Sequence, residues 1–191
     1  WNQPWLPLIS TTLLLTLLSA LLALAITPWL LVLLCPWKGC RPLLQSLGLL
    51  ARLLPPPLTA LLMLFVLKPG LLPAVLALGL HNAGILGRLL LESLDARDCR
   101  ASQALQLAGA GPRRSLLVAG FNAVARGYLS FGAYRADVIL RESVVVGLVG
   151  AGGLGVLLLE SLSSFAWIDV VPVLVVYAVL TLMGEAAADA Y

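Results

Sequence analysis

Long apolar runs, most of them rich in leucine, alternate with short polar segments along the whole chain. A helix that crosses a bilayer needs roughly 20 mostly apolar residues. The runs therefore predict about five membrane-spanning helices, at about 6–34, 58–67 extended into the segment before it, 71–91, 116–140 and 166–184. The alternating strands of a membrane barrel are absent. The pattern predicts an all-α, polytopic membrane helix bundle that forms one domain over residues 1–191.

Composition excludes an ordinary soluble domain. The 191 residues are 61% hydrophobic and only 11% charged, and their mean hydropathy is +1.02. The tryptophans lie near predicted span ends, as an aromatic belt requires, at Trp1, Trp5, Trp29, Trp37 and Trp167. Three cysteines without paired spacing (Cys35, Cys40, Cys99) and a single histidine favour neither a disulfide framework nor a Cys/His metal site.

The basic residues predict which loops face the cytoplasm. Segment 35–54 holds three Lys or Arg and includes a short amphipathic helix over 42–53, expected at the membrane surface. Residues 88–114 hold five Arg, whereas Lys68 stands alone in a tight turn. The positive-inside rule places 35–54 and 92–115 in the cytoplasm, the N-terminus outside and the C-terminus inside.

The long polar segment 92–115 is the first functional candidate. It predicts two short helices joined by 108–111, where Gly109 permits a sharp connection because it lacks a Cβ. A cytoplasmic helix–turn–helix between two spans is a lever that a soluble partner can grip. The alternative is an ordinary solvated loop, with Glu92 and Asp95 on its solvated face.

The stretch 134–155 is the second candidate, because charges at membrane depth usually face protein or water. It carries Arg135, Asp137, Arg141 and Glu142. Arg135 and Asp137, with Tyr134 beside them, would line an anion route in which the guanidinium offers an oxyanion a bidentate site. A structural pair, or a charge that reaches the interface, explains them equally well.

Two other groups of polar residues carry weaker hypotheses. Arg126 and Tyr128 raise the same question of an anion route with less support. His81 and Asn82 are expected to form hydrogen bonds between helices.

A glycine-rich run closes the second candidate stretch. It contains a literal G-x-G-x-x-G from Gly150 to Gly155, which a dinucleotide site would use to admit a pyrophosphate. No βαβ pattern surrounds it. Close helix packing or a hinge is therefore the better interpretation, with Gly147, Gly150, Gly152, Gly153 and Gly155 as its residues.

Together these motifs resemble the membrane subunit of binding-protein-dependent ABC importers, specifically the phosphonate-type permease family. Gln103-Ala104-Leu105, with Gly109 six residues after the glutamine, occupies the place of the EAA-loop motif. Tyr134-Arg135, Arg141 and the run from Gly147 to Gly155 match the family's late segment. His81 to Gly84, followed by Gly87 and Glu92, fits its helix before the loop. The likeness covers most of residues 10–185, and the glycine run is its most specific part.

The resemblance implies a type I importer permease that moves phosphonate or a related small oxyanion across the bacterial inner membrane. It implies a homodimer in membrane lipid, an external solute-binding protein, and a separate ATPase that docks on 92–115 through Gln103, Ala104, Leu105 and Gly109. No G-x-x-x-x-G-K-[ST] loop is present, so ATP hydrolysis belongs to the partner. No enzyme activity, cofactor, metal or nucleic acid is expected.

The chain also departs from the family pattern. Gln103 replaces the first glutamate of the EAA motif, Asn122 replaces its closing proline, and a first helix and a basic tail are missing, as in a truncated chain. Three alternatives stay open. They are a permease for another small solute, a non-transporting regulatory membrane subunit, and an intramembrane enzyme acting on lipid phosphates. The last needs clustered acids or nucleophiles, and the nine acids here are scattered.

Overall fold

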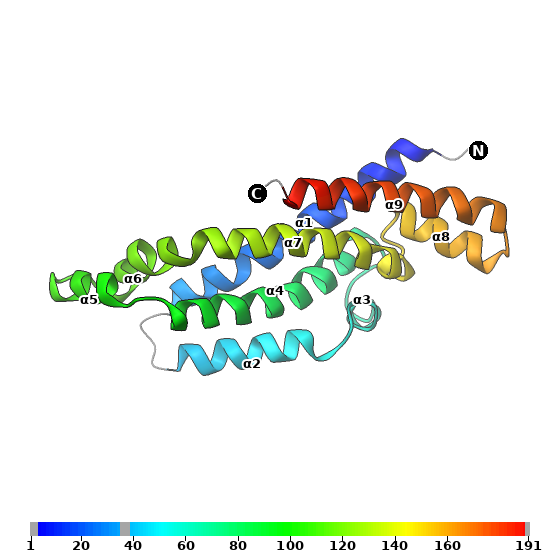
Figure 1. Ribbon diagram of the computed structural model, residues 1–191. Coiled ribbons are helices and arrows are strands. Elements are labelled where there is room, and N and C mark those ends of the chain that lie inside the picture. Colours follow the sequence, from blue (N-terminus) through cyan, green and yellow to red (C-terminus); the bar gives the residue numbers. More distant parts are fainter. Residues whose placement is uncertain (1–3, 35–38, 190–191) are drawn as a thin grey trace.

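The computed structural model describes residues 4–34 and 39–189, and this part of the chain consists of helices joined by turns, without a strand (Figure 1). The longer helices are α1 (Trp5–Leu34), α2 (Cys40–Leu53), α4 (Leu71–Ala96), α7 (Asn122–Val146) and α9 (Trp167–Asp189). The shorter elements are α3 (Pro56–Met63), α5 (Arg100–Leu107), α6 (Pro112–Ser115), the π-helix η1 (Leu116–Phe121), the 3-10 turn η2 (Gly147–Val149) and α8 (Gly153–Ser163). The predicted all-α class is confirmed. Trp1, Trp37 and Cys35 lie outside the described residues.

Three described helices, α1, α4 and α9, are long and apolar enough to cross a membrane, which confirms the first, third and fifth predicted spans. The second predicted span is wrong as a continuous helix. α3 has only eight residues and meets α2 at 90°, because the prolines at 55–57 break the chain between them. The fourth span is a helix, but α7 carries too many charges to pass as an apolar span.

The amphipathic helix predicted over 42–53 exists as α2, but it does not lie flat at the membrane surface. It runs alongside α4 over its length (Figure 1). Cys40 and Leu44 are buried on its inner side, whereas Leu49 and Leu50 are exposed. α2 is therefore a peripheral helix of the bundle.

Small and hydroxyl-bearing residues make up most of the inner face of α1, and several of its leucines face outward. The buried residues are Thr12, Leu15, Thr16, Ser19, Ala20, Ala23, Thr27 and Leu31, whereas Leu13, Leu14, Leu17 and Leu21 are 45–57% exposed. In lipid no hydrophobic force drives helices together, so small residues that let backbones approach closely form the interfaces. Because α1 is hydrophobic on all sides, its hydropathy pattern does not show which face is buried.

The contact between α1 and α4 shows how close this approach is. A Cβ on Gly87 would lie 2.8 Å from Thr27 Oγ1, and the Thr27 hydroxyl donates a hydrogen bond to the Ala83 carbonyl at 3.2 Å. Elsewhere on α4, Ala74, Ala77 and Leu78 are also buried, in a cluster with residues of α1, α3 and α7. α1 and α4 therefore form the rigid centre against which the other helices pack.

The start of α2 and the hairpin of α5 and α6 lie at one end of the bundle, where α4 ends, whereas the last turn of α2, with Arg52, lies toward α3 (Figure 1). Arg41 at the start of α2 pairs with Asp95 near the end of α4. Arg113 of α6 donates to the Leu33 carbonyl at the end of α1 at 2.9 Å. These contacts bring Arg41 and Arg113 to the same end of the bundle, and the orientation in the membrane stays a prediction.

The opposite end holds the hairpin of α8 and α9 (Figure 1). Leu154, Leu158, Val170 and Val173 of these two helices form a buried cluster against the start of α1. Gly184, near the end of α9, lies beside Asp137 of α7. The described part of α9 therefore runs from the α8 end of the bundle back alongside α7 (Figure 1).

Replacing Thr12 by valine should destabilise the fold. The buried Thr12 hydroxyl accepts a hydrogen bond from the backbone amide of Leu154, in the first turn of α8, at 3.0 Å, and valine cannot accept it. We expect a loss of about 1–3 kcal/mol in the free energy of unfolding, measured by denaturation in mixed micelles. Thr11→Val is the matched control, since the Thr11 hydroxyl donates only within its own helix, to Pro7 O. Equal stability of the two variants would contradict the assignment.

Candidate functional site

The segment between α4 and α7 is a helical hairpin whose second arm is continuous with α7. α5 ends at Leu107, and the chain reverses at Gly109, which has a φ of +89°. The Ala110 amide closes this turn on the Leu105 carbonyl at 2.9 Å. The prediction of two separate short helices is corrected here. α6 is only the first turn of a rod that runs through the π-helix η1 into α7, because Pro112 starts a helix and nothing after it interrupts the chain.

Buried polar contacts hold α5 against the start of that rod. The Ser115 hydroxyl, 1% exposed, donates to the Ser102 carbonyl at 2.9 Å. Arg97 donates to the Ser102 hydroxyl at 3.1 Å. The guanidinium of Arg97 also lies on Gly120 of the π-helix, where a Cβ would be 2.5 Å from Nη1. These contacts join α5 to the end of α4 and to the start of the rod.

The outer side of α5 is free of such contacts. Gln103 and Ala104 are exposed, Leu105 is half-buried, and the Leu107 side chain is 90% exposed. An exposed leucine at the tip of a polar hairpin, next to small residues, is a surface suited to a partner's groove.

The π-helix is a feature that the sequence reasoning missed. It ends at Asn122, whose side-chain amide donates to the Val118 carbonyl at 2.7 Å. Asn122 is also the position where the family motif has a proline. A π-helix is a local irregularity of the i→i+4 ladder, frequent at functional sites.

The charges on α7 separate into two sets on opposite faces. Positions 135 and 142 are two turns apart and share one face, whereas 137 and 141 share another. Arg135 donates to the Asn82 side chain of α4 and lies 3.6 Å from Glu142, which also accepts from Asn82 Nδ2 at 3.0 Å. Asn82 is completely buried. Its predicted hydrogen bond between helices is confirmed, and so is that of His81, which bonds to Leu54 O at 3.2 Å.

The second set joins α7 to α9. Arg141 pairs with both Asp137 and Glu185. Asp137 is 5% exposed, and its Oδ1 has no hydrogen-bond partner among the described residues. Tyr134 is 61% exposed and belongs to neither set. The structure therefore does not bring Tyr134, Arg135 and Asp137 together at one site.

The weaker candidates on α7 also separate. The Tyr128 hydroxyl donates to the Leu24 carbonyl of α1 at 3.0 Å, whereas Arg126 is exposed.

The glycine run turns the chain between α7 and α8 with two backbones in contact. A Cβ on Gly147 would lie 2.5 Å from the Gly155 carbonyl carbon, and one on Gly155 would lie 2.8 Å from the Val144 carbonyl oxygen. Gly150, Gly152 and Gly153 have positive φ values of 69–78°. The Thr12 hydroxyl occupies the α8 N-terminus, where a dinucleotide phosphate would have to bind.

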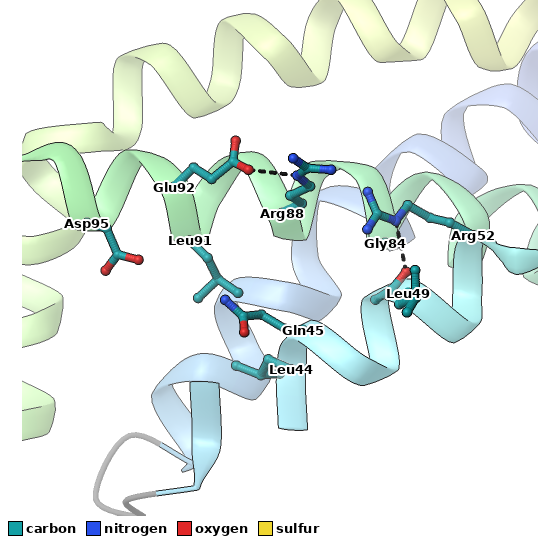
Figure 2. A pocket seen from close by; sticks show the side chains of 10 residues that line it. Leu44, Gln45, Leu49, Arg52, Gly84, Arg88, Leu91, Glu92 and Asp95 are labelled. Atoms are coloured by element: carbon teal, nitrogen blue, oxygen red, sulfur yellow. Dashed lines mark hydrogen bonds and ion pairs between the residues drawn. The ribbon is translucent and has the colours of Figure 1, made fainter. Parts of the chain in front are cut away.

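A polar groove between α2 and α4 is the second feature that sequence reasoning missed (Figure 2). It has a volume of about 350 Å³ and is lined by Leu44, Gln45, Gly48, Leu49, Arg52, Gly84, Arg88, Leu91, Glu92 and Asp95. Glu92 and Asp95 are exposed, as predicted, but they pair with Arg88 and Arg41 and form part of a site. The sequence does indicate this groove, because polar residues and glycines recur at helical spacing on both helices. They are Arg41, Gln45, Gly48 and Arg52 on α2, and His81, Gly84, Arg88, Glu92 and Asp95 on α4.

The described residues contain no cluster of three or more His, Cys, Asp or Glu side chains that could hold a metal ion. Cys40 and Cys99 are free thiols.

Comparison with solved structures identifies the fold. A crystal structure of an amino acid ABC transporter with histidines matches with a TM-score of 0.74 at 17% identity, covering 99% of this chain and 97% of that one. The MetNI methionine ABC transporter in inward-facing conformations matches with a TM-score of 0.78 at 19% identity, covering 97% and 93%. No protein-family model matches the chain.

Curated relatives identify the family. PhnE, a phosphate-import permease protein of Mycolicibacterium smegmatis, is 34% identical over 132 residues, 69% of this chain and 25% of that protein. PtxC, a phosphite transport system permease protein of Stutzerimonas stutzeri, is 38% identical over 115 residues, 60% of this chain and 42% of that one. PhnE2 of Escherichia coli K12, assigned to a cryptic phosphonate transport system, is 34% identical over 91 residues, 48% and 75%. The chain thus spans from a quarter to three quarters of these relatives.

The fold is that of the membrane subunit of an ABC transporter. Within that class, the chain belongs to the family of phosphonate and phosphite transport permeases, which confirms the resemblance read from its motifs. Membership and the apolar helices place it in the bacterial inner membrane as a multi-pass protein.

Substituting Gly155 by alanine should destabilise the turn between α7 and α8, because the new methyl group meets backbone that cannot rotate away. We expect a loss of about 1–3 kcal/mol, as for other overpacked sites. Gly127→Ala on α7 is the control, since nothing lies within 4 Å of its Cβ position. Thermal unfolding of the two purified variants checks this, and an unchanged midpoint for Gly155→Ala would contradict the packing.

Proposed function

We propose that this chain is the permease subunit of an ABC importer that carries a phosphonate or a related phosphorus oxyanion across the inner membrane. The observation that carries the proposal is the family membership. The names of its relatives refer to phosphate, phosphite and phosphonate, which are all tetrahedral phosphorus oxyanions. The net charge of +3 is consistent with an anionic substrate.

We further propose three partners. A separate ATPase supplies the energy, since the sequence has no phosphate-binding loop of its own. An external binding protein delivers the substrate. A second copy of the chain completes a homodimer with the pathway at its interface.

The hairpin of α5 and α6 is the proposed docking point for the ATPase, with Gln103, Ala104, Leu105 and Gly109 as its contact residues. Two observations support this. Its outer side is exposed up to Leu107, and its inner side is fixed to the rod of α6, η1 and α7 through Ser102 and Ser115. Movement of the ATPase would therefore reach α7 as a displacement of a stiff helix.

The glycine turn after α7 is the proposed joint at the other end of that rod. Gly147 and Gly155 pack backbone against backbone, so small rotations of α7 are passed to α8 without a side chain between them. Gly150, Gly152 and Gly153 supply the positive φ values that the turn needs.

The function is tested with the encoded ATPase and binding protein reconstituted in proteoliposomes. We expect ATP-dependent uptake of labelled phosphite or methylphosphonate. Uptake of a different solute, such as an amino acid, would contradict the substrate class. ATPase stimulation without uptake of any solute would favour a regulatory membrane subunit instead.

Changing Gly109 to valine should weaken the coupling of ATP hydrolysis to transport. A β-branched residue at positive φ costs about 1–3 kcal/mol of backbone strain, so the turn at φ +89° would relax and move the docking residues. We expect ATPase stimulation by the loaded binding protein to fall on the order of fivefold or more.

Gly111→Val is the matched control for this measurement. Both glycines have nothing within 4 Å of a Cβ position, but Gly111 has a φ of −65°, which valine adopts freely. Equal stimulation in the two variants would remove the hairpin turn from the coupling path.

For Arg135 we propose a structural role, in which it holds α7 to α4, and not a contact with the transported anion. Asn82 and Glu142 already satisfy its guanidinium, and its side chain is 18% exposed. Arg135→Gln would leave Glu142 without its cation, so we expect reduced assembly and uptake. The double variant Arg135→Gln/Glu142→Gln removes both charges, and should recover assembly and uptake toward the wild type.

The measurement is uptake per assembled complex for both variants. If Arg135→Gln assembles normally yet transports poorly, and the double variant does not recover, then Arg135 contacts the substrate and the structural proposal is wrong.

A further inference from the structure

The polar groove between α2 and α4 is built around one close helix contact. A Cβ on Gly84 would lie 2.5 Å from the Gly48 carbonyl oxygen and 2.8 Å from Arg52 Cγ. Two glycines therefore bring α2 and α4 together, and the stem of Arg52 lies directly on Gly84 (Figure 2). Close packing of this kind requires small residues at the crossing.

This contact makes two arginines converge. Arg52 follows Gly48 by one helical turn, and Arg88 follows Gly84 by one turn. Side chains on a helix lean toward its N-terminus, and Arg52 does so, because its Nε donates to the Gly48 carbonyl at 3.2 Å. Because the two glycines face each other, Arg52 and Arg88 line the same groove, and the Arg88 side chain is 64% exposed (Figure 2).

The local charges leave this point positive. Arg88 uses Nε for Glu92, at 2.7 Å, and Arg52 uses Nε for the Gly48 carbonyl, at 3.2 Å. Among the described residues, no carboxylate lies within ion-pair distance of Arg52. Asp95 is paired with Arg41, farther along the groove. Two guanidiniums therefore face one carboxylate.

We propose that Arg52 and Arg88 form a binding site for a tetrahedral phosphorus oxyanion, and that its occupant is the transported substrate. The inference rests on the proposed function. Guanidinium forks match the oxygens of such anions in bidentate geometry. The groove of about 350 Å³ has room for phosphite or a small phosphonate. Charged side chains at this position in a membrane protein belong beside water or protein and not against lipid tails.

The experiment uses the complete transporter in proteoliposomes, with phosphite as the probe. The maximal uptake rate, the ATPase rate and the phospholipid that copurifies with the complex are measured for Arg52→Gln, Arg88→Gln and Arg52→Lys. Arg126→Gln is the matched control, because it removes an exposed arginine on α7 outside the groove. Size-exclusion chromatography checks that each complex assembles.

We expect both glutamine variants to lose uptake by about tenfold or more, the loss expected for a charge-assisted hydrogen bond, while the ATPase remains stimulated and the lipid content unchanged. Arg52→Lys should recover uptake only in part, because an ammonium lacks the planar fork. Arg126→Gln should resemble the wild type.

Two results would overturn the proposal. If the glutamine variants lose copurified anionic phospholipid but transport normally, the oxyanion in the groove is a lipid headgroup and not the substrate. If neither uptake nor lipid content changes, the groove binds no oxyanion. Absence of phosphite and phosphonate uptake in the wild type would instead contradict the proposed function, and the lipid measurement would still test the groove.

Discussion

The structure depends on one constraint: a polar group placed between membrane helices must find its partner inside the protein, because lipid offers none. This constraint applies above all to α7, which carries several charged residues within the bundle. Its Arg135 and Glu142 bind the buried Asn82 of α4, and its Arg141 pairs with both Asp137 of the same helix and Glu185 of α9. These pairings fix the rotation of α7 about its axis. They also explain why a helix with so many charges can pack beside the apolar α1 and α4.

Small residues at the helix contacts are the second requirement. The polar contacts form only where backbones approach closely, and this approach requires positions without large side chains. Thr27 and Gly87 bring α1 to α4, Gly48 and Gly84 bring α2 to α4, and Gly147 and Gly155 close the turn after α7. At the Gly48–Gly84 crossing the two requirements meet, because the packing that joins the helices also directs two cations into one groove.

Much of this architecture could be predicted from the sequence. Hydropathy located α1, α4 and α9, and the glycine run and the segment around Gln103 indicated the family, because these signals are local. The prolines at 55–57 marked the break before the second predicted span, but the apolar run 58–67 did not reveal that α3 ends at Met63 after only eight residues. The π-helix before Asn122 has no hydrophobic signature at all.

The candidate site was harder for a physical reason. The choice of partner for each charge depends on how helices far apart in sequence are rotated against each other. The sequence analysis grouped Arg135 with Asp137. Residues two positions apart on a helix lie on nearly opposite faces, and in the structure the two side chains have different partners. Arg52 and Arg88 are distant in sequence and meet only through the packing of Gly48 on Gly84.

The central claim, that close packing of α2 on α4 opens a polar groove to water while the outer face of α2 meets lipid, is tested most directly by thiol accessibility at two neighbouring positions. Leu49 lines the groove and Leu50 does not, although they are 58% and 64% exposed and lie at the same depth. In a cysteine-free background reconstituted in vesicles, Leu49→Cys should react with a membrane-impermeant maleimide and Leu50→Cys should not. Equal reactivity, or protection of both, would contradict the account.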